Sequence, residues 1–168
     1  MVALGGVGLA LQSSVHREPR QPLRALTPAG FSVLAAIADR ICPGTGELPT
    51  AWELEVPEGV DAYLATRDPG VAEELELGLM LVENGLPSLL LDGRARPFTA
   101  RSPADQDATL AGMAASRIEL RRKLYKAFLA LVTTTYWGHP DAYRFAGYRP
   151  ADFTAFVPSP PEPPEEAP

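Results

Sequence analysis

Three side chains in this sequence have chemistry suited to acid–base catalysis, namely those of Asp39, Glu53 and His139. A carboxylate or an imidazole can transfer protons when its surroundings bring its pKa close to the working pH. Asp39 and His139 also fall near the ends of expected helices, and Glu53 falls in an expected loop, so each has a simpler structural interpretation. A small independent enzyme built on these groups is one hypothesis, and it requires that they share a cleft.

Cysteine and histidine are too few for the common metal sites. The sequence has one cysteine, Cys42, and two histidines, His16 and His139. A single cysteine excludes an intrachain disulfide, a zinc ribbon and the CxxCH motif of a c-type cytochrome. Neither histidine belongs to a Glu-x-x-His or His-Glu-x-x-His pattern. Cys42 ends an expected helix, where a partly buried apolar residue is a simpler interpretation than a reactive thiol.

Glycine motifs for phosphate binding or nucleophilic catalysis are also missing. The glycines at positions 5, 6 and 8 fail the dinucleotide-binding pattern because Leu11 stands where glycine or alanine is needed. No Gly-x-Ser-x-Gly elbow occurs, and a net charge of −6 argues against broad nucleic-acid binding. We therefore expect no catalytic, cofactor-binding or metal-binding residue on this chain.

Apolar residues recur at helical spacing over most of the chain, and no long segment alternates with the period of a strand. Three helix starts are marked by a capping residue followed by proline. These pairs are Thr27-Pro28, Asp68-Pro69 and Ser102-Pro103. Further helices are expected from Pro57 and from Arg117 to Thr135. The sequence predicts an all-α fold, a compact bundle of about five to six helices with long loops.

The expected helix after Asp68 carries apolar residues on two faces. One stripe comprises Val71, Leu75, Leu79, Val82 and Leu86, and Leu77, Met80 and Leu81 lie outside it. Because a helix that is apolar all round is usually buried, we expect this helix at the centre of the fold. Glu73 and Glu74 are expected in its first turn, where carboxylates interact favourably with the helix dipole.

Two further segments have open interpretations. Residues 43–57 form a long loop around Trp52, and loops of that length often have a function; a short helical turn from Thr50 to Leu54 is the alternative. Basic residues cluster in the first half of the last helix, as a solvated face or, less simply, as a docking patch. They are Arg117, Arg121, Arg122, Lys123 and Lys126.

Aromatic residues are concentrated between Tyr136 and Tyr148, directly after the last long helix. Such a segment can fold back over the core, and it can face a partner, since Tyr and Trp are enriched at the centres of interfaces. The two roles can coexist. The candidate partner-binding residues are Trp52, Tyr136, Trp137, Pro140, Tyr143 and Tyr148.

Composition divides the chain into three parts. Residues 1–25 hold an apolar, signal-like run from Val2 to Leu11 and a polar linker, residues 26–156 form the helical domain, and residues 157–168 are a Pro- and Glu-rich tail expected to be disordered. The apolar run is shorter than the roughly 20 residues that span a bilayer. Since no basic residue precedes it, it is either the remainder of a truncated export signal or only an apolar terminus.

Several short motifs follow one another in a distinctive order. They are Leu26-Thr27-Pro28, Asp39 to Pro43, Ala51-x-Glu53-x-x-Val56, Val60-Asp61-x-Tyr63-Leu64, Tyr136-Trp137-Gly138-His139-Pro140 and Gly147-Tyr148-Arg149-Pro150. In this order they resemble the gluconate 2-dehydrogenase subunit 3 family, over roughly residues 26–150.

The resemblance implies a non-catalytic accessory subunit. It implies a chain that binds, stabilises and is exported with a flavin-dependent dehydrogenase of the glucose-methanol-choline type, acting on gluconate, another sugar or an alcohol. FAD would belong to that large subunit, and a multihaem cytochrome c would be a further partner. Export would place the complex in the periplasm or cell envelope. The twin-arginine signal of the family is missing here, so a cytoplasmic location is expected if Met1 is the true start and no signal exists.

A stand-alone helical interaction module is the alternative hypothesis. In that case the polyproline-like tail, residues 157–168, would recruit the partner. Deletion of the tail separates the two hypotheses, because only the module depends on it.

Overall fold

The computed structural model describes residues 17–84 and 96–147, and the following statements refer to these residues. The elements in chain order are α1 (Pro28–Ile41), α2 (Val56–Leu64), α3 (Pro69–Glu83), the short 3-10 helix η1 (Phe98–Ala100), α5 (Pro103–Ala114), α6 (Glu119–Gly138) and α7 (Pro140–Tyr143). Within the described ranges no strand forms, and the predicted all-α fold is confirmed. The apolar run Val2–Leu11, Leu86, Tyr148 and the C-terminal tail lie outside the described residues.

The three predicted cap-and-proline pairs all begin helices. The side-chain oxygens of Thr27, Asp68 and Ser102 accept hydrogen bonds from backbone N–H groups in the first turn of α1, α3 and α5. Each cap thereby satisfies a donor that has no partner within the helix. α2 begins at Val56, one residue before Pro57, and α6 begins at Glu119 and extends to Gly138, beyond the predicted range.

The turn from Thr50 to Leu54 takes the alternative, helical form. The backbone N–H of Thr50 donates to the Glu53 carboxylate at 2.7 Å, and the N–H of Glu53 donates to the Thr50 hydroxyl at 3.1 Å. This reciprocal arrangement is a capping box. It closes a single turn that leads directly into α2, so the loop after α1 is shorter than predicted.

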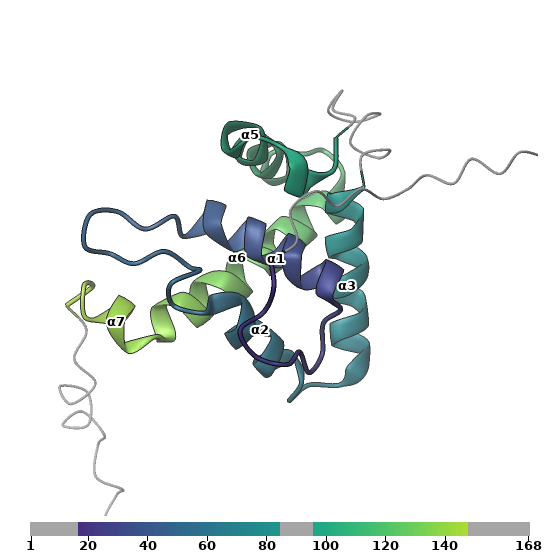
Figure 1. Ribbon diagram of the computed structural model, residues 1–168. Helices are drawn as coiled ribbons and strands as arrows, with labels where there is room; N and C mark the ends of the chain where they lie inside the picture. The colour runs from purple at the N-terminus through teal and green to yellow at the C-terminus, as the bar shows by residue number, and fades with distance from the viewer. Residues whose placement is uncertain (1–16, 85–95, 148–168) are drawn as a thin grey trace, which may run out of the picture.

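The central helix is α1, so the prediction that the helix after Asp68 is central was wrong. α1 packs against α2, α3, α5 and α6, and most of its side chains from Phe31 to Ala38 are buried (Figure 1). α3 covers only one side of α1, and its Leu77 and Leu81 face solvent. Periodicity showed that α3 is apolar on two faces, but it did not show that only one of them has a neighbour.

The glutamates of α3 also lie elsewhere than predicted. The first turn of α3 comprises Pro69 to Ala72, and it contains no acidic residue. Glu73 and Glu74 therefore occupy the second turn, because the helix begins at the proline directly after its Asp68 cap. Their interaction with the helix dipole is weaker there, since the effect is concentrated in the first turn.

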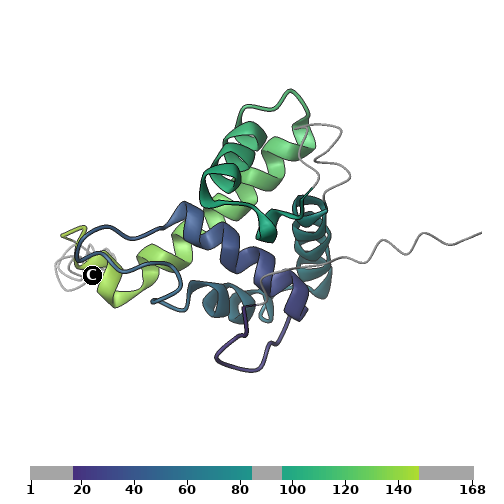
Figure 2. The same ribbon diagram turned by 45° about the horizontal axis from the view of Figure 1, so that its top comes forward.

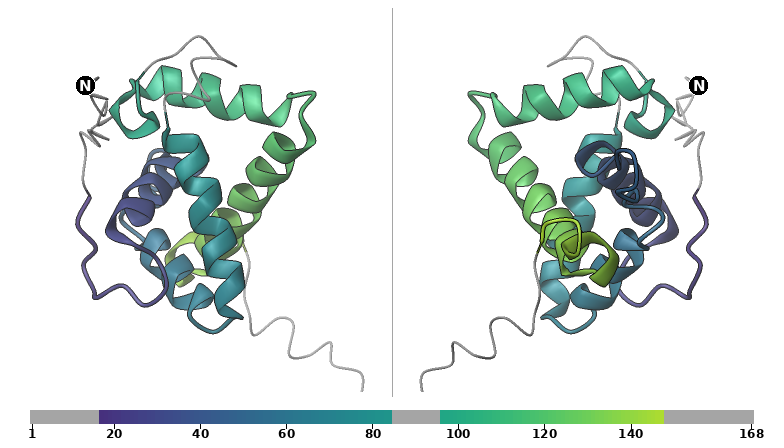
Figure 3. Two further views of the ribbon diagram at one scale, coloured as in Figure 1. Left: turned by 90° about the vertical axis from the view of Figure 1, so that its right-hand side faces the viewer. Right: turned by 90° about the vertical axis from the view of Figure 1, so that its left-hand side faces the viewer.

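Helices α3, α5 and α6 form the three sides of a triangle when the molecule is viewed toward α3 (Figure 3, left). α3 and α6 approach each other at Gly78, where a β-carbon would lie 2.6 Å from the Cδ2 atom of Leu124. Only a residue without a side chain fits there unless Leu124 moves. The absence of a side chain at Gly78 therefore makes room for Leu124 between α3 and α6.

A buried carboxylate holds the segment before α1. Asp61 of α2 is 4% exposed, and its two oxygens accept hydrogen bonds from the backbone N–H groups of Arg24, Ala25 and Leu26 at 2.8, 3.0 and 2.8 Å. The segment consequently runs beside α2 before it enters α1 (Figure 2). Three donors compensate the loss of water around one charged group.

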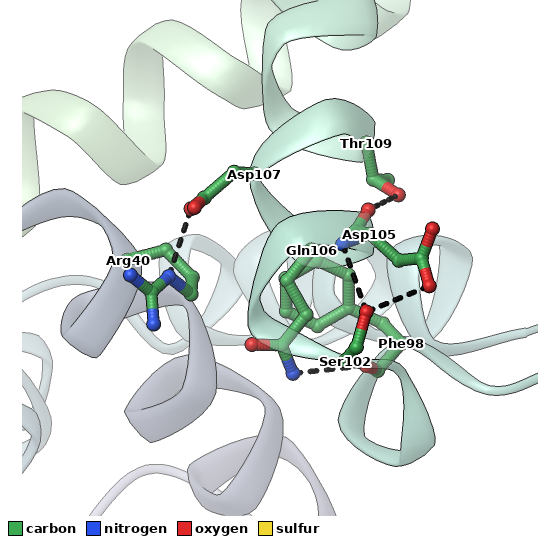
Figure 4. A network of polar contacts seen from close by, with 7 residues as sticks. All are labelled: Arg40, Phe98, Ser102, Asp105, Gln106, Asp107 and Thr109. Carbon is green, nitrogen blue, oxygen red and sulfur yellow. Dashed lines mark hydrogen bonds and ion pairs between the residues drawn. The ribbon is translucent and has the colours of Figure 1, made fainter.

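A polar network joins α1, η1 and α5 around the buried ring of Phe98 (Figure 4). The Arg40 guanidinium pairs with Asp107 at 2.8 Å, and the Gln106 side-chain amide donates to the carbonyl oxygen of Phe98 at 3.1 Å. Ser102 donates to the Asp105 carboxylate while accepting from the Asp105 N–H, which completes the cap of α5. These contacts fix the start of α5 against the central helix.

Candidate functional site

The three candidate acid–base residues each make a local structural contact. Asp39 forms an ion pair with Arg17 at 2.5 Å, and the Nδ1 atom of His139 accepts from the Asp141 N–H at 3.2 Å at the start of α7. Hydrogen bonds from the backbone and the hydroxyl of Thr50 lower the pKa of Glu53. Over the described ranges, no three His, Cys, Asp or Glu side chains are placed to hold a metal ion.

Cys42 lies at the end of α1 in a buried position. Burial raises the pKa of its thiol to about 11, because the thiolate loses the stabilisation of water. A thiolate is the nucleophilic form, so at neutral pH the side chain acts as a small apolar residue of the core.

Among the predicted partner-binding residues, Tyr136 belongs to the core. It is 1% exposed, and its hydroxyl donates to the carbonyl oxygen of Pro49 at 2.6 Å. Burial, followed by the nearby Cys42 and Glu53, raises the pKa of Tyr136. Its ring packs edge-on against that of Trp137, with 5.1 Å between the centroids. Tyr136 therefore attaches the end of α6 to the loop after α1.

The remaining aromatic residues of this end are more accessible. Trp137 is 43% exposed, Phe145 is 51% exposed, Pro140 is exposed and Tyr143 is half-buried. A recess of about 440 Å³ separates α7 from the loop after α1, lined by Glu47, Pro49, Asp141, Arg144 and Phe145. We call this region the aromatic end. Tyr148 lies beyond the described residues.

Trp52 is not part of the aromatic end, because its contacts are with the N-terminal segment and α1. The guanidinium groups of Arg17 and Arg20 lie 4.9 and 5.1 Å from its ring centroid, and the ring of Phe31 lies 6.5 Å away in an edge-on arrangement. Cation–π contacts of this geometry are favourable. Trp52 thus holds the N-terminal segment against the fold and is half-buried by the chain itself.

A second apolar surface was missed by the sequence reasoning. Leu77 and Leu81 of α3 are 66% and 44% exposed, and Leu120 of α6 is 55% exposed. We call these three residues the outer leucine face. The signal was present in the sequence, since Leu77 and Leu81 lie outside the main stripe of α3, but it was interpreted as burial.

The outer leucine face has charged residues on both sides. Arg117, two residues before α6, and Lys123 and Lys126 in its first half are exposed, and Glu73 and Glu74 are exposed on α3. Lys123 pairs with Glu119 at 2.8 Å along the helix, whereas Arg122 donates to the carbonyl oxygen of Ser116. Exposure of these side chains agrees with a solvated basic face and leaves them accessible to a partner.

None of the described helices is both long and apolar enough to cross a membrane.

Comparison with known protein families identifies a match. The family model described as gluconate 2-dehydrogenase subunit 3 matches residues 28–154. The match begins at the first residue of α1 and includes every described helix. Neither the curated proteins nor the solved structures contain a match to this chain.

Proposed function

We propose, from the premise that this chain belongs to the gluconate 2-dehydrogenase subunit 3 family, that it is the non-catalytic small subunit of a flavin-dependent dehydrogenase complex. Its partner is a large subunit of the glucose-methanol-choline type that carries FAD and oxidises gluconate, another sugar or an alcohol. A multihaem cytochrome c is the proposed electron acceptor. We further propose that the small subunit is exported with its partner to the periplasm or cell envelope.

The observation that carries this proposal is the extent of the family match. It covers residues 28–154, so every described helix lies within the family match. The exposed leucines and the exposed Trp137 support it, because large apolar side chains left in water are available to a protein partner. The candidate acid–base side chains are engaged in caps and ion pairs, which agrees with a binding role.

The small subunit would stabilise its partner by mass action. A chain that binds the folded dehydrogenase and not the unfolded one adds RT ln(1 + [L]/Kd) to its stability, about 2.7 kcal/mol when the free small subunit is at 100 times its Kd. No chemistry on this chain is required for that effect. Loss of the small subunit would therefore reduce the amount and lifetime of active dehydrogenase rather than the rate of its chemical step.

Affinity purification from the native host tests the proposal. The tagged chain should retain a flavoprotein, visible from the flavin absorbance of the eluate, with dye-linked sugar, sugar-acid or alcohol dehydrogenase activity. A chain lacking residues 157–168 should retain the same flavoprotein. If the tail deletion abolishes capture, the interaction-module alternative is the better account, and if the full chain elutes colourless and without a partner at native expression levels, the accessory-subunit proposal fails.

A further inference from the structure

We propose that the dehydrogenase docks on the outer leucine face, with acidic groups of the dehydrogenase opposite the basic first half of α6. This inference rests on the proposed function and names the surface and the kind of partner surface that it requires. It places the main contact on α3 and α6 rather than on the aromatic end.

Two of the three leucines lie one helical turn from a close contact between α3 and α6. A β-carbon on Gly78 would contact Leu124, Leu81 lies one turn after Gly78, and Leu120 lies one turn before Leu124. Leu77 lies one turn before Leu81 on α3. Residues one turn apart share a helix face. Leu124 is itself only partly buried and joins the two sides. Leu81 and Leu120 are therefore each one turn from the residues that bring α3 and α6 together, on two helices that cross in the view of Figure 3 (left).

These leucines contribute little to the fold. Leu77 is 66% exposed, whereas Leu75 and Leu79 on the opposite side of α3 are buried against the core. Apolar area that remains in water gains free energy only when something covers it. Single exposed leucines are common, but three near one contact between two helices offer apolar area of the kind that a partner covers at an interaction site.

Charge indicates which partner surface fits. Residues 117–126 contain five basic residues and one acidic residue, although the whole chain has a net charge of −6. The basic groups lie on the α6 side of the leucines, and Glu73 and Glu74 lie on the α3 side. A partner with an apolar centre and acidic groups facing α6 is complementary to this pattern. Such complementarity accelerates association and fixes the orientation of the complex.

The aromatic end is less suited to be the main contact. Tyr136 is committed to the core by its hydrogen bond to Pro49, and Trp137 packs on it. The adjacent recess is lined by three charged side chains, Glu47, Asp141 and Arg144, and Arg144 lies 3.5 Å from Asp141. A second copy of this chain is another possible occupant of the leucine face, and the experiment below separates it from the dehydrogenase.

The test measures the affinity of the purified flavoprotein for variants of the full-length chain. Leu77→Ser combined with Leu81→Ser, and separately Leu120→Ser, should each weaken binding by about tenfold or more. Phe145→Ser is the matched control, because Phe145 is similarly exposed and lies on the aromatic end; it should bind like the wild type. Arg117→Glu with Lys126→Glu should slow association at low salt, and the effect should diminish at high salt.

The outcomes are distinct. If the wild-type chain captures a flavoprotein and the leucine variants bind it with unchanged affinity, the docking surface is wrong and the proposed function stands. If Phe145→Ser weakens binding and the leucine variants do not, the aromatic end is the interface. If the leucine substitutions dissociate a homodimer of this chain in sedimentation experiments but do not change binding to the flavoprotein, the outer leucine face is a homodimer interface. If the wild type captures no flavoprotein, both proposals fall. Melting temperatures equal to that of the wild type ensure that the variants are folded.

Discussion

The hydroxyl of Tyr136 donates a hydrogen bond to the carbonyl oxygen of Pro49, 2.6 Å away and 87 positions earlier in the chain. This contact joins the last turn of α6 to the loop after α1, beside Cys42 at the end of the central helix. The Tyr136 ring is buried, and its hydroxyl oxygen has a defined partner. Tyr136 therefore provides a fixed surface against which the exposed ring of Trp137 packs. The aromatic end is thus partly core and partly surface.

Tyr136→Phe should destabilise the fold by about 1 kcal/mol, since it leaves the partly buried Pro49 carbonyl without this donor. Chemical denaturation followed by circular dichroism measures the change. Tyr63→Phe is the control, because Tyr63 is exposed and the guanidinium of Arg67 lies over its ring, a contact that phenylalanine can keep. Equal stability of the two variants would show that the Tyr136 hydroxyl has no role in the fold.

Asp61→Asn should destabilise the protein by about 2–3 kcal/mol. The substitution removes the negative charge and turns one acceptor into a donor that faces the backbone N–H groups of Arg24 to Leu26. Asp68→Asn is the control, because asparagine caps helices about as well as aspartate. Urea denaturation of both variants gives the comparison. A loss below about 0.5 kcal/mol for Asp61→Asn would mean that the N-terminal segment is not held in this way.

Gly78→Ala should destabilise the protein by about 1–2 kcal/mol even though alanine favours helices, because the new methyl group would press on Leu124. Gly112→Ala provides the opposite case within α5. Its β-carbon would have no heavy atom closer than 4.0 Å, so the variant should gain about 0.5–1 kcal/mol from helix propensity. Thermal unfolding of the two variants measures the change in stability of each. A stabilised Gly78→Ala variant would contradict the close packing of α3 and α6.

Cys42 should make stability fall with rising pH in alkaline solution. Burial raises the pKa of its thiol from about 9 to about 11 in the folded state, so the unfolded chain releases this proton first as the pH rises. Between these values the folded state binds more protons, and its stability decreases with pH. The stabilising contribution is complete below pH 9 and is lost as the pH passes 11.

Denaturation from pH 7 to 11 measures the Cys42 contribution, with Cys42→Ala as the reference because lysines and tyrosines titrate over the same range. The wild type should lose more stability than the variant. Thiol-specific reagents should also label the native protein slowly at pH 8, at a rate limited by opening of the structure. Rapid labelling of the folded chain would contradict the buried position.

Local signals in the sequence predicted the helix starts well, because a cap and a proline act within one turn. Thr27, Asp68 and Ser102 all bond to N–H groups two or three residues later, so their effect can be inferred from neighbours in the chain. The contacts of Asp61 and Tyr136 span 35 to 87 positions. Such partners depend on how the helices are arranged, and no local pattern encodes them.

The candidate site was harder to predict than the fold. The partner-binding roles of Trp52, Tyr136 and Trp137 stay a prediction. In the structure Trp52 also holds the N-terminal segment, and Tyr136 is part of the core. Helical periodicity identified Leu77 and Leu81 as apolar without indicating whether a neighbour covers them. Which face of α3 remains uncovered depends on the position of α1, and that information exists only at the level of packing.

The thermal stability of the flavoprotein, measured with and without this chain, tests the central claim most directly. Release of flavin fluorescence on heating reports unfolding of the dehydrogenase alone, since this chain is proposed to carry no flavin. Addition of the purified chain should raise the melting temperature by several degrees in a concentration-dependent manner, in line with binding to the folded state. An unchanged melting temperature at a large excess of the chain would contradict its role as a stabilising subunit.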